Sequence, residues 1–354
     1  MTIDMSMVID RLNRYTENEL VYKEYYEING DRQRLKLFAK KHPHEDVLLR
    51  RLILPGLYPD SIPPEDFFCD ENLFSSGRNV RLWKHDRYTP AFLHSHDVFE
   101  MNYVLSGGCR QKIGEKEITF HTGDICFIAL NVPHTIEVFD ESIVINILIR
   151  RDTFDDIFLT DLRSKTLLTT FFLDSLYQND KTDFIIFHTG DDVVIRDMIL
   201  EMCMETHEED VYADNLLTHM TSILFSKLMR GYADTAMVSQ HRSREFYDQI
   251  EIVGYLQNHY QTATLAETAE HFGYNMTYCS KLIKKTTGTN FVQLLREIRM
   301  KQAERLLRGT PASIEKIAER VGYENAGTFI RVFKQSRGMT PSQYRSEKTV
   351  EPLI

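Results

Sequence analysis

Three histidines and one glutamate are spaced so that their side chains could share one site. His94 and His96 alternate along the chain, and alternate side chains of an extended strand point to the same face. Glu100 follows four residues later, and His134 lies in a later β-rich run. Together they offer three imidazole nitrogens and one carboxylate, a donor set that suits a transition metal ion. The same side chains could instead form the polar lining of a pocket for a small molecule.

A second group of residues belongs to an internal repeat about fifty residues long within residues 264–338. Ala269 and Gly273 in the first copy return as Ala318 and Gly322 in the second, each pair four residues apart. An alanine allows two helices to cross closely, and the glycine permits a tight turn between them. The repeat therefore predicts two helix-turn-helix units.

The second helix of each unit would present polar residues opposite its apolar stripe, where they could enter the major groove of DNA. Basic residues nearer the helix ends would reach phosphates. The predicted DNA-binding residues are Thr277, Ser280, Lys281, Lys284 and Lys285 in the first unit, and Gly327, Thr328, Arg331 and Lys334 in the second. Gly327 has no side chain with which to read a base, so direct readout by the second unit would rest mostly on Arg331.

Local signals mark where the helices of this region begin and end. Thr264 followed by Glu267 predicts a capping box at the start of the first unit, and Ser313 can cap the start of the second. Residues 291–309 read as one continuous helix that ends before Pro311. Such a helix would fix the distance between the two units.

The histidines and the glutamate must be positioned by a β-rich region. Between residues 79 and 150, short β-rich runs alternate with turn residues, which predicts an antiparallel sandwich or barrel. Aromatic side chains of this region could line a pocket beside the cluster. The predicted effector-binding residues are His94, His96, Glu100, His134, Trp83 and Tyr103.

Both regions resemble known families. Residues 245–346, with the closing run 338–345 (GMTPSQYR), resemble the DNA-binding domain of the AraC/XylS family of bacterial transcription regulators. The run from His94 to Gly107 resembles the first cupin motif, and the run from Gly123 to His134 resembles the second, although Val138 replaces its expected asparagine-like ending. The resemblance implies a cupin-like sensor of a small metabolite, such as a sugar, joined to two units that enter successive major grooves.

The predicted fold class is an α+β multidomain chain, with an N-terminal cupin-like β-barrel flanked by helices and a C-terminal all-α domain that holds two helix-turn-helix units. The predicted domains are a helical N-terminal extension and Pro-rich loop (1–70), a cupin-like sensor domain (71–165), a helical dimerisation or connector region (166–238), a linker (239–244) and the DNA-binding domain (245–348). One apolar stripe in the connector would face the core or form a dimer seam: Leu216, Leu217, Met220, Ile223, Leu224 and Leu228.

The distribution of charge agrees with DNA binding by the C-terminal part alone. The net charge is −10, yet residues 243–348 hold 16 Lys and Arg against 11 Asp and Glu. The first fourteen residues contain no apolar run that could serve as a signal peptide or membrane span, so we expect a cytoplasmic protein. The five cysteines form no CxxC pair, which favours reduced thiols over a zinc cluster.

These observations predict an effector-controlled, sequence-specific transcription regulator, an activator by resemblance, rather than an enzyme. The expected partners are double-stranded DNA, a small-molecule effector, RNA polymerase and a second copy of the chain; no membrane, cofactor or catalytic residue is predicted. One alternative is a cupin metalloenzyme with an appended DNA-binding domain, in which His94, His96, Glu100 and His134 would ligate the metal. Another is an architectural DNA binder whose affinity ignores metabolites.

Overall fold

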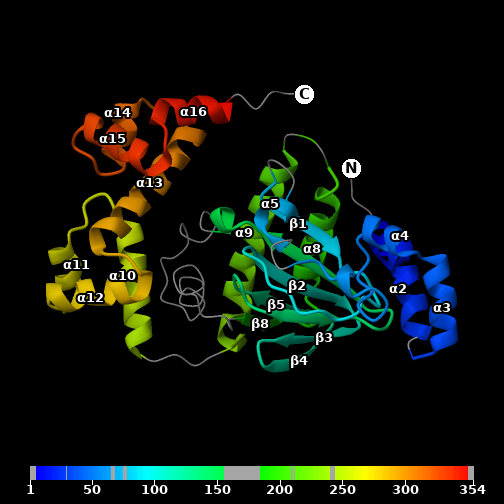
Figure 1. Ribbon diagram of the computed structural model, residues 1–354. Coiled ribbons are helices and arrows are strands. Elements are labelled where there is room, and N and C mark those ends of the chain that lie inside the picture. The colour runs from blue at the N-terminus through cyan, green and yellow to red at the C-terminus, as the bar shows by residue number, and fades with distance from the viewer. Residues whose placement is uncertain are drawn as a thin grey trace. The chain divides into compact units, whose positions relative to one another are not determined.

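The computed structural model describes residues 5–28, 30–64, 68–74, 78–154, 184–208, 210, 212–239 and 244–349. The chain divides into two compact units, Met1–His241 and Arg242–Ile354 (Figure 1). The N-terminal unit contains every described strand, and the C-terminal unit is helical where it is described.

The N-terminal unit is built on two antiparallel sheets. The larger sheet has the strand order β1-β7-β2-β5-β8-β9, and the smaller has the order β4-β3-β6. The strands are β1 (Val80–Lys84), β2 (Phe99–Ser106), β3 (Gly108–Ile113), β4 (Lys116–His121), β5 (Asp124–Ile128), β6 (His134–Glu137), β7 (Ile143–Ile149), β8 (Phe184–His188) and β9 (Met237–Val238). The predicted β-rich domain is confirmed.

The central strands are apolar along almost their whole length because both faces of the larger sheet are covered. Every residue of β5 and β7 is buried, and in β2 only the last residue is exposed. Polar residues interrupt these strands at a few positions, among them Glu100 and Asn102 in β2 and Asn146 in β7, and all three are buried. These polar positions carry the site described below.

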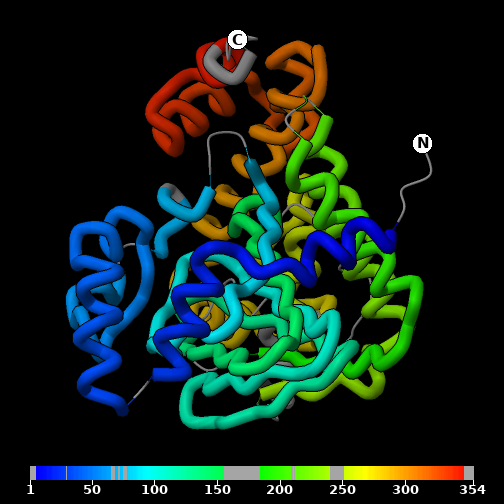
Figure 2. The backbone as a smooth tube through the Cα atoms, turned by 90° about the vertical axis from the view of Figure 1, so that its right-hand side faces the viewer, coloured from blue at the N-terminus to red at the C-terminus, as the bar shows by residue number. Residues whose placement is uncertain are grey.

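Two helices cover one face of the larger sheet: α8 (Val193–Glu205) and α9 (Ala213–Tyr232). Ile199 of α8 and Leu217 and Phe225 of α9 are buried in the same hydrophobic core as the strands. The first helix, α1 (Met5–Asn13), packs against α8, and Figure 2 shows it in dark blue beside the green helices. Short 3-10 turns also occur at Pro59–Ser61 (η1) and Ala233–Thr235 (η3).

Three N-terminal helices form a small layer with its own core: α2 (Glu17–Ile28), α3 (Arg32–Lys41) and α4 (His44–Leu49). Tyr22, Phe38 and Val47 are buried together there with Tyr88, which follows β1. An ion-pair cluster ties this layer to the barrel: Glu19 accepts from Arg87 at 2.9 Å and from Lys84 at 2.8 Å, and Glu19 is fully buried. The short helix α5 (Asp70–Leu73) lies apart from this layer, and its Leu73 is buried with Val98 and Leu148.

Two sequence predictions for this unit need correction. A mainly helical connector at 166–238 was wrong at Phe184–His188, where β8 pairs with β5. Residues 184–188 form a strand because they pair with β5, which is distant in the sequence, and the helical periodicity of the surrounding residues does not show this pairing. The Pro-rich loop contains the helix α4, which begins just after Pro43, where proline is compatible with a helix start. Residues 155–183 and most of the predicted linker, 240–243, lie outside the described residues.

The predicted stripe on α9 divides into two faces. Leu217, Leu224 and Leu228 are fully buried against the sheet, whereas Leu216 and Ile223 are 47% and 49% exposed. The first three residues therefore belong to the core and cannot form a dimer seam. The exposed pair remains available for such a role within the described part of the chain.

The C-terminal unit consists of α10 (Arg244–His259), α11 (Leu265–His271), α12 (Met276–Thr287), α13 (Phe291–Gly309), α14 (Ile314–Arg320), α15 (Ala326–Arg337) and α16 (Pro341–Thr349). Helix α13 has the bounds that the sequence predicts, from Phe291 to Gly309. The capping box of Thr264 with Glu267 and the cap at Ser313 are both present, so these local predictions are confirmed.

Candidate functional site

The four residues of the histidine cluster converge inside the barrel. His94 and His96 precede β2, Glu100 lies in β2, and His134 begins β6. The two early histidines do not lie on a regular strand, because His94 makes only a single bridge, to His134. One ligand atom from each of the four residues nevertheless lies within 4.8 Å of the others, so the structure brings the predicted set together.

The Nδ1 atom of each histidine in the cluster lies within hydrogen-bond distance of a backbone carbonyl. A carbonyl oxygen can only accept, so each Nδ1 carries the proton of that bond and each neutral ring keeps its lone pair on Nε2. The accepting oxygens are those of Phe92 for His94 at 3.2 Å, Val98 for His96 at 3.1 Å and Val132 for His134 at 2.9 Å. Backbone carbonyls are common outer partners of metal-binding histidines.

Glu100 stands at the centre of the cluster. Its Oε2 lies 2.6 Å from Nε2 of His96 and 3.0 Å from Nε2 of His134. Burial acts to raise the pKa of Glu100, but the neighbouring His96 and His134 hold it well below its ordinary value. The Oε2 atom can accept a hydrogen bond from a ring that carries a proton on Nε2, or it can join the two Nε2 atoms as a ligand of one metal ion.

His94 and His96 differ in the direction in which their pKa values are shifted. Burial and then the charge of His134 lower the pKa of His94 to about 3, so its ring is neutral at pH 7. For His96, burial acts to lower the pKa, but the charge of Glu100 outweighs it and the pKa is raised. The cluster thus holds both a neutral imidazole donor and a histidine able to keep a proton beside a carboxylate.

A polar layer supports Glu100 from behind, and the sequence analysis missed it. Asn102 Nδ2 donates to Glu100 Oε1 at 2.8 Å and to Asn146 Oδ1 at 3.0 Å, and Gln111 Nε2 donates to Asn102 Oδ1 at 3.1 Å. All are buried. The signal was present as single amides inside otherwise apolar strands, since buried polar groups need partners nearby.

A cavity of about 200 Å³ opens beside the cluster. Of the six predicted effector-binding residues, Trp83, His94, His96 and Glu100 line it, whereas Tyr103 and His134 do not. Tyr103 lies one residue beyond Asn102 on β2, so its side chain points to the opposite face and is buried in the apolar core. The other lining residues are Tyr22, Arg51, Ile53, Phe68, Leu73, His85, Asp86, Thr89, Phe92, Ile136, Asn146 and Leu148.

His85 gives this cavity an unsatisfied polar group. Its Nε2 is buried and has no hydrogen-bond partner among the described residues. Burial lowers the pKa of His85 to about 4, so the ring is neutral at pH 7 and can donate or accept one further bond. Tyr22 and Arg51 bring the N-terminal helical layer to the same cavity.

The second candidate site is the outer face of the two helix-turn-helix units. Helices α12 and α15 have matching ends: Asn275 and Asn325 cap their N-termini, and Gly288 and Gly338 end them in the left-handed conformation. Each helix has twelve residues. The second turn is one residue longer, which explains why the glycine of the turn, Gly322, is shifted relative to the caps.

One face of each reading helix is buried, and the opposite face is exposed. Cys279, Leu282 and Ile283 in α12, and Phe329 and Phe333 in α15, are buried. Val332, which aligns with the buried Leu282, is only half-buried. Eight predicted DNA-binding residues are exposed and Ser280 is half-buried: Thr277, Lys281, Lys284, Lys285, Gly327, Thr328, Arg331 and Lys334.

The structure adds two residues to this face and removes one. Tyr278 and Ile330 are exposed at 41% and 36%, and the matching caps place Ile330 at the position of Ser280. Arg337, a basic residue at the end of α15 near Lys334, does not contribute its charge to this face, because it forms ion pairs with Glu297 at 2.7 Å and with Glu304, both on α13.

Two protein-family models match parts of the chain. Residues 268–347 match the helix-turn-helix domain model, and residues 79–145 match the cupin domain model. The chain pairs an AraC-type helix-turn-helix domain with a cupin domain. The AraC-type domain contains α12, α13 and α15, and the cupin domain contains the histidine cluster.

Similar curated proteins are named as transcription regulators. The raffinose operon regulatory protein RafR of Pediococcus pentosaceus is 32% identical over 37% of this chain and 47% of its own length. The activator RhaR of Mannheimia succiniciproducens is 25% identical over 73% of this chain and 89% of its own. This chain spans less than half the length of several of these relatives. It covers 47% of the length of RafR, and 11% and 33% of the lengths of the Bacillus subtilis regulators YtdP and YisR.

Solved structures with similarity include the C-terminal domain of AraT from Geobacillus stearothermophilus. It is 35% identical, with a TM-score of 0.30, and the match covers 32% of this chain and 94% of that domain. ToxT from Vibrio cholerae is 15% identical over 75% of this chain, with a TM-score of 0.33. Among the helices that the structure describes, none is both long and apolar enough to cross a membrane.

Proposed function

We propose that the protein is a sequence-specific DNA-binding transcription regulator. The duplicated reading helix supports this proposal: α12 and α15 share length, caps and buried face, and each turns an exposed polar face outward. The 19-residue helix α13 lies between the two units along the chain. A pair of matched helices on a rigid connector suits two successive major grooves.

Within this surface, base reading falls to the middle of each helix and phosphate contact to its end. Lys281 and Arg331 occupy equivalent positions, six residues after the N-caps, and Arg331 has a planar fork that can grip guanine O6 and N7 together. Lys284 and Lys334 lie one turn later, where they would reach phosphates. Thr277, Ser280, Lys285, Gly327 and Thr328 complete the proposed surface.

The test is a titration of the full chain against duplexes that it selects from a randomised library. Arg331→Ala is expected to lose about 1–3 kcal/mol on the selected duplex and to relax preference at one base position. Lys284→Ala is expected to weaken binding equally on selected and scrambled duplexes, and to reduce the salt slope by about one. Lys112→Ala, which removes an exposed charge from the other unit, is the matched control.

If the wild-type chain selects no sequence, or binds selected and scrambled duplexes alike, the proposal fails. Equal losses for Arg331→Ala on both duplexes would make Arg331 a phosphate contact. Circular dichroism of each variant checks that the fold is kept.

We propose that the cupin domain binds the controlling effector in the 200 Å³ cavity beside the histidine cluster. The volume is below the common range of about 300–1000 Å³, which favours a small ligand. His85, His94 and Asn146 provide polar groups, and Trp83 and Phe92 provide flat walls. A small polyol such as a monosaccharide has that mixture of hydroxyl groups and apolar ring faces.

Thermal-shift screening of the full chain with monosaccharides, followed by DNA titration with each hit, tests this assignment. His94→Ala with His96→Ala is expected to abolish the ligand shift and leave DNA affinity without ligand unchanged. A retained shift in this double variant would remove the histidines from the ligand site.

A metal ion at the cluster is the second candidate, and the protonated Nδ1 atoms favour it. With their protons on Nδ1, the three rings can offer Nε2 lone pairs to one metal ion beside the carboxylate of Glu100, a donor set that fits Zn²⁺, Fe²⁺ or Ni²⁺. After removal of metals with a chelator, the full chain is expected to bind one equivalent of Ni²⁺ by calorimetry. Glu100→Gln and His96→Ala should lose it, while the control His188→Ala, an exposed histidine paired with Asp124, should keep it.

The remaining proposals concern partners and setting. We propose a cytoplasmic homodimer that uses the exposed α9 residues Leu216 and Ile223 as its seam. We also propose activation of transcription through RNA polymerase, because RhaR is named as an activator. A binding function rather than catalysis is supported by the names of the curated relatives. We keep the domain boundaries that the sequence predicts, with one change. Strand β8 (Phe184–His188) is assigned to the cupin domain because it pairs with β5.

A further inference from the structure

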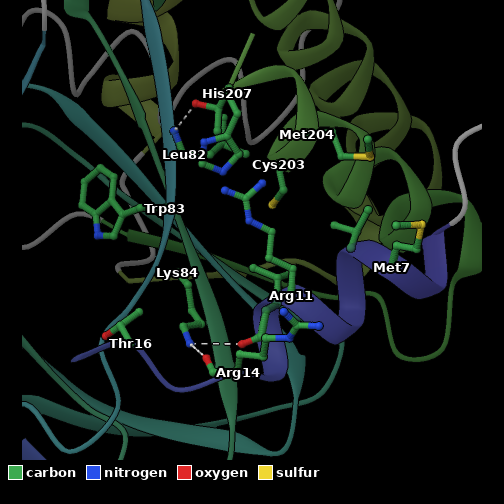
Figure 3. A pocket seen from close by; sticks show the side chains of 13 residues that line it. Met7, Arg11, Arg14, Thr16, Leu82, Trp83, Lys84, Cys203, Met204 and His207 are labelled. Carbon is green, nitrogen blue, oxygen red and sulfur yellow. Dashed lines mark hydrogen bonds between the residues drawn. The ribbon is translucent and has the colours of Figure 1, made fainter. Parts of the chain in front are cut away.

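A second cavity lies outside the barrel and is separate from the histidine cluster. It has a volume of about 680 Å³ and is bordered by α1, β1 and the C-terminal end of α8 (Figure 3). This volume is within the range of about 300–1000 Å³ that ligand pockets occupy. None of the cluster residues lines it.

The walls of this cavity are mostly apolar and rich in sulfur. Met7 of α1 and Cys203 and Met204 of α8 bring three sulfur atoms to it, beside Val8, Leu12 and Leu82. Figure 3 shows Met7, Cys203 and Met204 on the same side, facing β1 across the opening. Thioether side chains are polarisable and make favourable contacts with aromatic rings. The wall therefore suits a flat aromatic body.

The charges in this cavity have one sign, and only part of that charge is neutralised. Lys84 is used within the protein, since its Nζ donates to Glu19 Oε2 at 2.8 Å and to the carbonyls of Leu12 and Arg14. Burial and then the charge of Arg11 lower the pKa of His207, which keeps that ring neutral at pH 7. The uncompensated positive charge rests with the guanidinium groups of Arg11 and Arg14.

Both guanidinium groups are available to a ligand. No ion pair joins Arg11 or Arg14 to a carboxylate of the described residues. Figure 3 shows the Arg11 side chain extending from α1 toward Cys203 and His207, inside the cavity. A guanidinium binds a carboxylate through two parallel hydrogen bonds, which fixes the orientation of the anion.

We infer that this cavity binds an aromatic carboxylate, with its ring against the sulfur-bearing wall and its carboxylate on Arg11, while Arg14 adds positive charge at the rim. The ligand would join α1 to α8 and β1, and so fasten the N-terminal helix to the barrel. This site is independent of the proposed effector cavity, because it shares only Trp83 with it.

The experiment compares two probes of the same shape, 2-naphthoate and the uncharged 2-naphthamide, by calorimetry on the full chain at fixed salt. 2-Naphthoate is expected to bind saturably and at least tenfold more tightly than 2-naphthamide. The double variant Arg11→Gln with Arg14→Gln should bind 2-naphthoate about tenfold or more weakly than the wild-type chain does. Its affinity for 2-naphthamide should be unchanged. Arg34→Gln, an exposed arginine on α3, is the matched control.

A second measurement locates the probe. In spectra of the chain with ¹³C-labelled methionine methyl groups, 2-naphthoate should shift the signals of Met7 and Met204, assigned by substitution with leucine. The signal of Met300, buried in the C-terminal unit, should stay in place. The inference is overturned by absence of saturation up to the solubility limit, by equal affinity for the two probes, by an unchanged double variant, or by unmoved Met7 and Met204 signals.

Discussion

The two turn glycines of the helix-turn-helix units are expected to differ sharply in their tolerance of a methyl group. Gly273 and Gly322 both adopt the left-handed conformation, with φ of 70° and 83°. A Cβ at Gly273 would meet nothing within 4 Å, whereas a Cβ at Gly322 would lie 2.3 Å from the backbone oxygen of Gln261. The repeat thus provides a matched pair, one position with backbone strain alone and one with strain and a collision.

The magnitude follows from these two terms. An alanine in the left-handed region costs about 1–2 kcal/mol at either site. Overpacking at Gly322 adds about 1–3 kcal/mol, because backbone has to move. The oxygen that must give way also accepts from Arg299 at 2.9 Å, which resists the shift. We therefore expect a loss of about 1–2 kcal/mol for Gly273→Ala and about 2–5 kcal/mol for Gly322→Ala.

Urea unfolding of the full chain can separate the units, because Trp83 is the sole tryptophan and lies in the N-terminal unit. Circular dichroism at 222 nm follows the helices of both units, and tryptophan fluorescence follows the N-terminal unit alone. Gly322→Ala should move the transition seen only by dichroism and leave the fluorescence transition in place. Equal losses for the two alanine variants would refute the packing argument, and a shifted fluorescence transition would refute its assignment to one unit.

Three further predictions test other features. Burial acts to raise the pKa of Glu19, but hydrogen bonds from Arg87 and Lys84 lower that pKa below 4.5. The ionised Glu19 therefore stabilises the fold above pH 4.5, and this stabilisation is lost as the pH falls through the lowered pKa. Glu19→Gln should cost up to about 3–5 kcal/mol at neutral pH, because it removes one of the two carboxylates that pair with the buried Arg87, the other being Glu141. It should also flatten the acid side of the stability profile, and an unchanged profile would contradict this. Leu216→Asp with Ile223→Asp should keep the fold and give monomers in sedimentation, whereas Leu217→Asp should unfold the unit; a folded dimer of the first variant would exclude the seam. Asn275→Ala and Asn325→Ala should each cost about 1 kcal/mol by denaturation, because each removes one helix cap, and a loss below the error of the measurement would mean that solvent replaces the cap.

The parts of the fold that local chemistry determines were predictable from the sequence. The capping box at Thr264, the cap at Ser313 and the limits of α13 depend on residues within a few positions of each other, and all three are confirmed. The convergence of His94, His96, Glu100 and His134 was also predictable, because motif spacing carries it.

The remaining features depend on partners distant in sequence. Strand β8 pairs with β5 about sixty residues away, and nothing within its own five residues distinguishes it from a buried helical turn. The division of the α9 stripe follows from which side meets the sheet, which periodicity alone cannot tell. Tyr103 was misplaced because its position on β2, one residue beyond Asn102, decides which face it takes.

The buried layer of amides and one carboxylate inside the barrel lowers the stability of the fold but provides polar groups that can recognise a ligand. Glu100, Asn102, Gln111 and Asn146 satisfy one another, but apolar side chains of similar volume would fill the same space without the desolvation of a carboxylate. A barrel selected only for thermal resistance would drift toward leucine and phenylalanine at these positions. Laboratory evolution under heat alone should therefore erode this layer first, and homologues that keep an apolar interior are candidates for barrels that have given up ligand sensing.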